Sequence, residues 1–348
     1  MDFSAEDIFR EKCNSCQRLD LLNMINDALI LSKAHGGKIL FMNQKALEMY
    51  QYTEEESLTL SFANISHESL ALMRENAQSA KRYAKGYIFT TNHVKKDGSI
   101  FKVEVSTRYM SFHGEMVFAS VVRNLTTSLK MQAEVELAGK IQRRLLPRDL
   151  DEESFRICSI YHPYNYVSGD LYDFIYDDEK KVLVGILIDV MGHGVSTAFQ
   201  TGILKYLFTR AIAQSIPINE KMAWINKEVM RFFAGGGFAG VLLFEFDYKC
   251  NTLTYSAGGI NHFIIHNSQG ATVIKTPGLF LGINETEVFE QGMYRFTSGE
   301  SFLFLTDGLF ELLAQPIPND IDFWETLKGI IAKGDFRDDA SGLGVLIR

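Results

Sequence analysis

Residues 188–194 read Ile-Asp-Val-Met-Gly-His-Gly and join two segments of different character. A nearly continuous apolar run, Val182 to Ile188, precedes Asp189, and a segment with helical periodicity begins near Val195. An apolar run of this length is typical of a buried strand, and the two glycines predict a turn into the helix. We therefore expect Asp189 to lie at the fixed end of a buried strand, where a carboxylate is well placed to bind a metal ion.

Other aspartates flank predicted strands that are far apart in the sequence. Asp170 begins one strand and Asp307 ends another, while Asp338 and Asp339 come directly before the last strand. A single aspartate at a strand end is commonly a turn former. Carboxylates that converge from several strands at one edge would repel one another and raise one another's pKa values, and divalent cations remove that repulsion.

Ligands that are all oxygen atoms suit magnesium or manganese better than zinc or copper. The sequence shows no nucleophile-elbow serine, no P-loop and no cluster of histidine and cysteine with zinc spacing. The carboxylates therefore predict two-metal hydrolysis, in which a water held between cations roughly 3.5–4 Å apart becomes hydroxide and attacks in line.

The segment after Pro147 is rich in predicted strands, with helices inserted in blocks. We expect strands at residues 155–161, 171–176, 181–190, 238–246, 252–256, 262–266, 293–297, 301–305 and 342–347. We expect helices at about 193–215, 219–233 and 321–332. This order differs from the regular alternation of a doubly wound fold, and it predicts an α+β sandwich of two packed sheets flanked by helices over residues 148–348.

Residues 21–127 form a second predicted domain, an antiparallel sheet with helices. Two strands flank the turn His35-Gly36-Gly37, a helix-compatible middle follows, and further strands are expected at residues 86–93, 100–109 and 116–122. The tetrapeptide Lys-Asp-Gly-Ser at 96–99 is a strong hairpin signal. Residues 1–20 are expected to form a short amphipathic lead-in helix.

Residues 128–147 are predicted to form an amphipathic linker helix that ends at Pro147. Its apolar residues recur at steps of three and four, at Met131, Val135, Ala138, Ile141 and Leu145. Such a helix packs on its own domain, or it forms a parallel coiled coil between two protomers and transmits the state of a sensor.

Composition limits the classes of partner. The chain has 348 residues and a formal net charge of −8, from 35 basic and 43 acidic residues, which argues against nucleic acid. No apolar run approaches the roughly 18 residues of a membrane span. The acidic start does not resemble a secretion signal, and the four cysteines do not make a disulfide framework, so we expect a cytoplasmic protein without a membrane partner.

Five motifs resemble, in order, those of the metal-dependent PPM-type serine/threonine phosphatases. The resemblance is to the bacterial branch that contains the sporulation stage II phosphatase and the stress-response sigma-factor regulators. The motifs are Ile-Gln-Arg-Arg-Leu-Leu-Pro at 141–147, Ser-Gly-Asp-Leu-Tyr-Asp at 168–173, Asp-Val-Met-Gly-His-Gly at 189–194, Thr-Asp-Gly at 306–308 and Asp-Asp-Ala-Ser at 338–341. They span about Leu137 to Arg348.

The resemblance implies roles for individual residues. Asp189 would bridge two manganese or magnesium ions, and the Val190 carbonyl would ligate one of them. Asp307 and Asp338 would complete the second site, with Asp339 as the alternative to Asp338. Asp170 would hold metal-bound waters. His193 is expected to stabilise the turn rather than to act as the general acid.

The chain departs from the family at a few positions. Family members usually carry a histidine where Gly259 stands, in Ala257-Gly258-Gly259. The departures remove none of the metal carboxylates and concern substrate contacts and local packing.

The first domain resembles PAS sensor domains. The resemblance rests on Gly-Lys-Ile-Leu-Phe-Met-Asn at 37–43, Gln-Tyr-Thr-Glu-Glu-Glu-Ser-Leu at 51–58, the hairpin at 96–99 and Arg-Asn-Leu-Thr at 123–126. The cysteine signature of flavin-binding relatives is absent, and neither His67 nor His93 has a haem-binding context. The PAS ligand is left open, between an empty or small-ligand pocket and a purely dimerising role.

These features together predict a PAS-regulated, manganese- or magnesium-dependent protein phosphatase. By resemblance its substrate would be phosphoserine or phosphothreonine on a STAS-domain antagonist of an anti-sigma factor. A homodimer through the PAS domain and the linker helix is expected. Two alternatives stay open: a catalytically silent adaptor with the same fold, and a phosphatase of a small phosphate ester.

Overall fold

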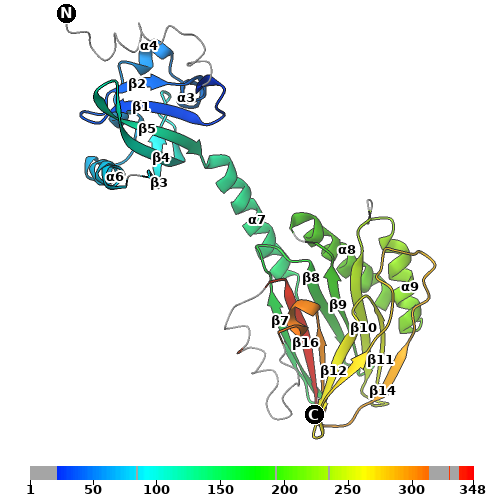
Figure 1. Ribbon diagram of the computed structural model, residues 1–348. Coiled ribbons are helices and arrows are strands. Elements are labelled where there is room, and N and C mark those ends of the chain that lie inside the picture. Colours follow the sequence, from blue (N-terminus) through cyan, green and yellow to red (C-terminus); the bar gives the residue numbers. More distant parts are fainter. Residues whose placement is uncertain (1–21, 84, 193, 234–235, 313–328, 330–336) are drawn as a thin grey trace, which may run out of the picture. The chain divides into compact units, whose positions relative to one another are not determined.

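The computed structural model describes residues 22–83, 85–192, 194–233, 236–312, 329 and 337–348 (Figure 1). The chain divides into two compact units between Gln132 and Ala133. The expected lead-in helix at 1–20, His193, and the expected helix at 321–332 except for Gly329 lie outside the described residues. None of the described helices is long and apolar enough to cross a membrane.

The first unit is an antiparallel sheet of five strands in the order β2-β1-β5-β4-β3. The strands are β1 (Ala28–Lys33), β2 (Ile39–Met42), β3 (Tyr87–Val94), β4 (Ile100–Phe112) and β5 (Glu115–Asn124). Four helices lie between β2 and β3 in the chain: α3 (Gln44–Tyr50), α4 (Glu54–Ser57), α5 (Phe62–Ile65) and α6 (Leu70–Arg82). All five strands expected in this region are confirmed.

Asn43 joins β1, β2 and α3 at the centre of this unit. Its side chain is fully buried and caps α3, because Oδ1 accepts hydrogen bonds from the backbone N–H of Ala46 at 3.0 Å and of Leu29 at 2.8 Å. Its Nδ2 donates to the carbonyl oxygens of Leu22 and Asp27, each at 3.1 Å. One amide thus satisfies backbone groups of three segments, which explains why this strand is followed by an asparagine.

The second unit contains two antiparallel sheets. One has the order β14-β11-β10-β9-β8 and the other β13-β12-β15-β16-β7-β6. The strands of the first sheet are β8 (Asp170–Asp177), β9 (Val182–Val190), β10 (Ala239–Asp247), β11 (Thr252–Gly258) and β14 (Gly292–Arg295). Those of the second are β6 (Leu150–Asp151), β7 (Phe155–His162), β12 (His262–Asn267), β13 (Gly270–Lys275), β15 (Ser301–Leu305) and β16 (Ala340–Ile347).

Strands β9 and β10 are buried on both faces. Leu187, Leu242 and Phe244 point into a core shared with the second sheet. The alternate residues, such as Ile186 and Ile188, pack against helices α8 (Val195–Ile212) and α9 (Ile218–Val229). Because both faces of these strands are covered, their sequences read as continuous apolar runs. The Phe244 and Phe304 rings stack between the sheets with centroids 4.1 Å apart.

The predicted sandwich is confirmed, and the sequence missed two of its strands. Strand β13 is largely exposed along its length and pairs only with β12 at the edge of the second sheet. Only Ala271 and Ile274 of this edge strand pack against core clusters, which leaves little hydrophobic periodicity, so no pattern marked it. Strand β6 contains two residues.

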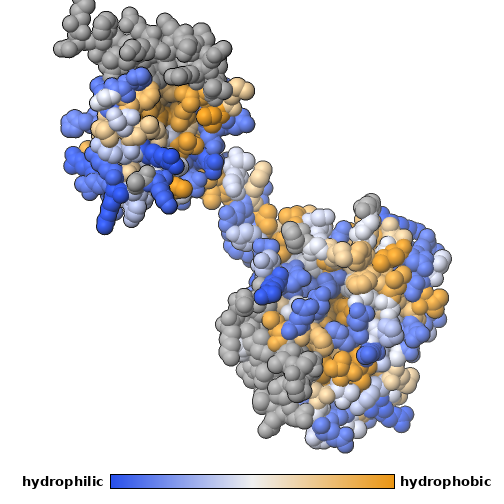
Figure 2. Space-filling model, in the orientation of Figure 1, coloured by the Kyte–Doolittle hydropathy of each residue, from blue (hydrophilic) through white to orange (hydrophobic). Residues whose placement is uncertain are grey.

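The helix predicted as a linker is α7 (Thr126–Arg144). Its face toward the second unit is marked by Gly139 and Gln142, both buried. Leu137 and Ile141 on its other side are exposed, at 58% and 53% of their full surface, as is Leu145 in the turn directly after the helix, at 44%. Orange apolar atoms are visible along this helix in Figure 2. The division of the chain at Gln132 places residues 133–144 of α7 with the second unit.

Gly139 allows α7 to lie against the loop that precedes β8. A Cβ at this position would overlap the Tyr166 carbonyl oxygen, whereas a Cβ at Gly202 in α8 would meet nothing within 4 Å. We predict that Gly139→Ala lowers the free energy of unfolding by about 1–3 kcal/mol through overpacking. Gly202→Ala should raise it by up to about 1 kcal/mol, because alanine is the better helix former. Denaturant unfolding of the two variants checks this, and equal effects would contradict the close approach.

Candidate metal centre

Asp170 and Asp189 lie directly opposite each other on neighbouring strands. Asp170 is the first residue of β8 and pairs in register with Asp189 near the end of β9. Asp170 is only 2% exposed, and Asp189 is half-buried. Two carboxylates predicted from separate motifs are therefore brought to one end of the first sheet.

Asp307, Asp338 and Asp339 come from the second sheet. Asp307 begins the short helix α10 (Asp307–Phe310) directly after β15, and the pair at 338–339 directly precedes β16. The two sheets are tied together here, because Thr306 Oγ1 donates a hydrogen bond to Asp170 Oδ2 at 2.7 Å. Thr306 is fully buried and also pairs with the backbone of Ser341.

The adjacent aspartates Asp338 and Asp339 face different partners. Asp339 is buried, and its two carboxylate oxygens accept from the backbone N–H of Tyr164 and of Gly169, each at 2.7 Å. Asp338 is exposed, and its Oδ1 accepts from the backbone N–H of Asp339 at 2.8 Å. Asp339 thus fixes the loop that carries Asp170, while the exposed carboxylate of Asp338 is accessible to an ion.

Two glycines are required by close approaches in this region. A Cβ at Gly169 would lie 2.6 Å from the Val190 carbonyl oxygen, and a Cβ at Gly308 would overlap the Asp339 carbonyl oxygen. The backbone N–H of Val190 donates to the Gly169 carbonyl at 2.9 Å. Gly192 and Gly194 have φ of 100° and 97°, a region that favours glycine and that the turn into α8 needs.

The carboxylates perturb one another electrostatically. Burial, and then the charges of Asp307, Asp338 and Asp339, raise the pKa of Asp189 to about 7. Burial and the charge of Asp189 raise the pKa of Asp170 well above its ordinary value, against a lowering effect of the Thr306 hydroxyl. Residues from four distant segments therefore act on one another, as the sequence predicted.

The donor set has the chemistry of a site for a hard divalent cation. Its side-chain donors are carboxylates, which prefer magnesium or manganese. Among the described residues, no three aspartate, glutamate, histidine or cysteine side chains are grouped closely enough to form a ready-made metal site. The buried carboxylates with raised pKa values fit a cation, because a positive charge removes both their repulsion and their desolvation penalty.

Gln142 of α7 extends the site in a way that the sequence did not predict. Its amide pairs with both backbone groups of Ser168: Nε2 donates to the carbonyl at 2.8 Å, and Oε1 accepts from the N–H at 3.0 Å. Nε2 also donates to Thr201 Oγ1 of α8 at 3.1 Å. The apolar periodicity of the helix did not single out Gln142, which lies within the motif at 141–147.

Helix α8 is also attached directly to β8. Lys205 of α8 forms an ion pair with Asp173 of β8, and the Asp173 side chain is buried. Helix α8 is therefore held by polar contacts at Thr201 and Lys205, in addition to its apolar face.

The raised pKa of Asp189 predicts a pH dependence of stability. Between its ordinary value of 3.8 and about 7, the folded chain binds more protons at this site than the unfolded chain. The contribution of Asp189 to stability therefore falls as the pH rises through this range. In the presence of a chelator, Asp189→Asn should be more stable than the wild type at about pH 8, and this advantage should shrink toward about pH 5.

Thermal unfolding across this range measures the difference, and comparing the two proteins cancels the titrating groups that do not interact with Asp189. Saturating manganese should remove the disadvantage of the wild type. A difference that does not change with pH would contradict the assignment of a strained carboxylate at this position.

Comparison with known proteins finds relatives of both units. A PAS domain model matches residues 26–127, and the family model of Stage II sporulation protein E (SpoIIE) matches residues 178–339. Phosphoserine phosphatase RsbP of Bacillus subtilis is 27% identical over 188 residues, which are 53% of this chain and 46% of that protein. Phosphoserine phosphatase RsbU of the same organism is 24% identical over 185 residues, 52% of this chain and 55% of that protein.

The chain spans about half the length of these two curated relatives. Among solved structures, the SiaA-PP2C domain of Pseudomonas aeruginosa matches with a TM-score of 0.53 at 16% identity, covering 64% of this chain and 99% of that domain. This likeness supports the fold of the second unit. The chain therefore combines a PAS domain with a PP2C-type phosphatase domain of the SpoIIE family.

Proposed function

We propose that this protein is a PAS-regulated, manganese- or magnesium-dependent phosphatase that hydrolyses phosphoserine or phosphothreonine in a protein. The observation that carries the proposal is the convergence of Asp170, Asp189, Asp307 and Asp338 from the ends of two sheets. The matched range of the SpoIIE family model, residues 178–339, includes Asp189, Asp307 and Asp338. The names of RsbP and RsbU as phosphoserine phosphatases support the reaction class.

Each residue has a proposed task. Asp189, Asp307 and Asp338 and the Val190 carbonyl would supply the oxygen ligands of the cations, and Asp170 would orient water at the site. When bound, the cations would lower the pKa of a water and neutralise charge on the phosphate. We assign Asp339 to the support of the 164–169 loop rather than to the metal, because both its oxygens are taken up by backbone N–H groups.

A folded protein is the proposed substrate. The PAS domain and α7 support an enzyme under regulation, and the similarity to RsbP and RsbU supports a phosphorylated STAS-domain antagonist of an anti-sigma factor. A small phosphate ester is the alternative substrate, and a silent adaptor is the alternative function. Retention of every candidate carboxylate favours an enzyme over an adaptor.

Hydrolysis of p-nitrophenyl phosphate with manganese tests the site. We predict that Asp189→Asn and Asp307→Asn each lower the metal-dependent rate by at least about a hundredfold, because each removes a charged ligand. Asp178→Asn is the matched control. Asp178 lies in the turn at the opposite ends of β8 and β9 and forms an exposed ion pair with Lys181, so its loss should leave the rate unchanged.

Full activity in both ligand variants would contradict the metal assignment. Dephosphorylation of a phosphorylated STAS-domain protein, compared with p-nitrophenyl phosphate on the same preparations, then separates a protein substrate from a small ester. A silent adaptor predicts no metal-dependent hydrolysis of either compound by the wild type.

We further propose that α7 controls the site from one face and forms a homodimer contact through the other. Gln142 joins α7 to the loop before Asp170 and to α8, so a shift of α7 would move both. Leu137, Ile141 and Leu145 form an exposed apolar stripe at steps of four, which fits a second copy of the same helix.

The roles of the two faces of α7 can be tested separately, by substituting either Gln142 or the adjacent Ile141. Gln142→Leu should lower the metal-dependent rate roughly tenfold or more without changing the oligomeric state, because it leaves both Ser168 backbone groups unpaired. Ile141→Asp should shift the protein toward monomer in analytical ultracentrifugation. If neither variant changed the rate or the sedimentation, the control by α7 would be wrong.

A further inference from the structure

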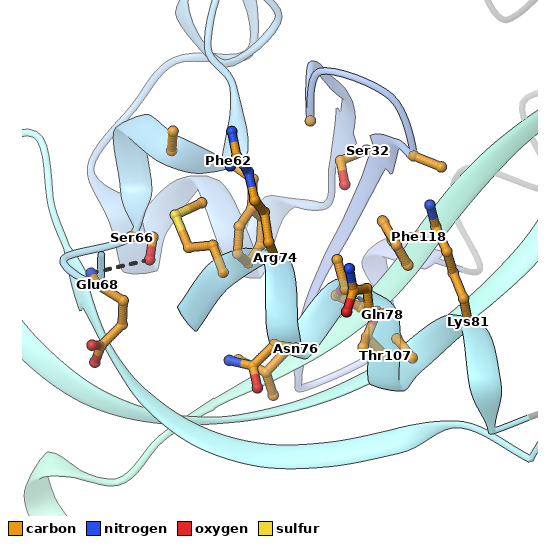
Figure 3. Close-up of a pocket in the computed structure, with 18 of the residues that line it drawn as sticks. Ser32, Phe62, Ser66, Glu68, Arg74, Asn76, Gln78, Lys81, Thr107 and Phe118 are labelled. Carbon is orange, nitrogen blue, oxygen red and sulfur yellow. Dashed lines mark hydrogen bonds between the residues drawn. The ribbon is translucent and has the colours of Figure 1, made fainter. Parts of the chain in front are cut away.

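The PAS unit contains a cavity of about 570 Å³ between α6 and the sheet (Figure 3). Its volume lies in the usual range for small-ligand sites, roughly 300–1,000 Å³. Strands β1, β3, β4 and β5 form one wall, and α6 with Phe62 of α5 forms the other. The buried pair Tyr50 and His93, hydrogen-bonded at 2.5 Å, does not line this cavity.

The sheet wall carries an unusual set of hydroxyl groups. Ser32, Thr91, Thr107 and Ser120 all line the cavity, and each is at most 5% exposed. Ser120 Oγ donates to Thr107 Oγ1 at 2.8 Å. Thr91 Oγ1 has no hydrogen-bond partner among the described residues. A buried hydroxyl without a partner is unfavourable, so the wall is better suited to a polar ligand than to an apolar core.

The helix wall supplies positive charge. Arg74, Gln78 and Lys81 follow helical spacing along α6 and line the cavity together (Figure 3). Arg74 and Lys81 are exposed at its mouth, and Lys81 also lies over the Tyr109 ring at 5.4 Å.

Two other charged residues line the cavity. Lys33 is paired with Glu115 at 3.3 Å. Glu68 accepts from the backbone N–H of Asn92 at 3.1 Å, which, together with the nearby Thr91 side chain, lowers the pKa of its carboxyl, and the carboxylate keeps its negative charge. The positive charge available to an anionic ligand is therefore that of Arg74 and Lys81, and a ligand group near Thr91 and Glu68 has to be uncharged.

Apolar and aromatic side chains also line the space, among them Phe62, Phe89, Val105 and Phe118, and Ser66 and Asn76 add polar groups. A ligand that matches the apolar lining, the basic residues of α6 and the hydroxyl groups of the sheet has an apolar body, an anionic group and a hydroxyl or similar polar group. We propose that the cavity binds a small carboxylic acid of this kind. Its carboxylate would meet Arg74 and Lys81, its body would contact the aromatic side chains, and its polar group would pair with Thr91.

Titration calorimetry of the full-length protein tests the proposal, which does not depend on the phosphatase site. The probes are benzoate, phenylacetate, mandelate and hexanoate, each compared with its uncharged amide. We expect saturable binding of at least one acid, and binding of its amide weaker by roughly tenfold or more, because charge-assisted hydrogen bonds are the strong ones.

Two variants locate the interaction. Arg74→Gln should remove most of the difference between acid and amide, while Arg82→Gln, a basic residue of the same helix outside the cavity lining, should preserve it. Thr91→Val keeps the side-chain shape and removes the unpartnered hydroxyl. It should leave the unliganded protein at least as stable, and it should weaken mandelate more than phenylacetate.

Three results would overturn the proposal. They are the absence of saturable binding for every acid in the set, equal affinity for acids and amides, and equal effects of Arg74→Gln and Arg82→Gln.

Discussion

The repulsion between buried carboxylates is the constraint on which the second unit depends. Asp170 and Asp189 face each other at one end of a sheet, and the charges of the other sheet's aspartates act on them. The surrounding structure holds them there against their own electrostatics. It does so with the Thr306 hydroxyl, which joins the sheets at Asp170, and with Asp339, which fixes the adjoining loop by two backbone hydrogen bonds.

The loop at 164–169 connects the aspartates to other parts of the second unit. Asp339 holds it from the second sheet, and Gln142 holds it from α7. Asp170 follows directly, so its position depends on both contacts. Helix α8 shares Gln142 through Thr201 and is also bound to β8 by Lys205. The edge that carries Asp170 and Asp189 and the linker helix are therefore parts of one hydrogen-bonded assembly.

Much of this arrangement could be predicted from the sequence, because burial on both faces leaves a continuous apolar signal. Strands β9 and β10 were predicted for that reason, and the aspartates at strand ends pointed to a shared edge. The different environments of Asp338 and Asp339 could not be predicted, since neighbours in sequence differ only in which way they face. Gln142 carried no periodic signal of its own, and exposed β13 carried almost none. The hydroxyl groups on the sheet wall of the PAS cavity could not be recognised from the sequence, because serine and threonine occur commonly on strands.

The pairing of Gln142 with Ser168 has a consequence for how α7 can act. A side-chain amide that gives and receives one hydrogen bond with the same residue imitates a peptide group in a ladder. A helix advances by about 100° per residue, so turning α7 by a single position would replace this amide with a neighbour that cannot make either bond. Both bonds would be lost together, with no intermediate arrangement. If α7 turned in this way, the contact would switch between a bonded and an unbonded state, and the response to the movement of the helix would not be graded.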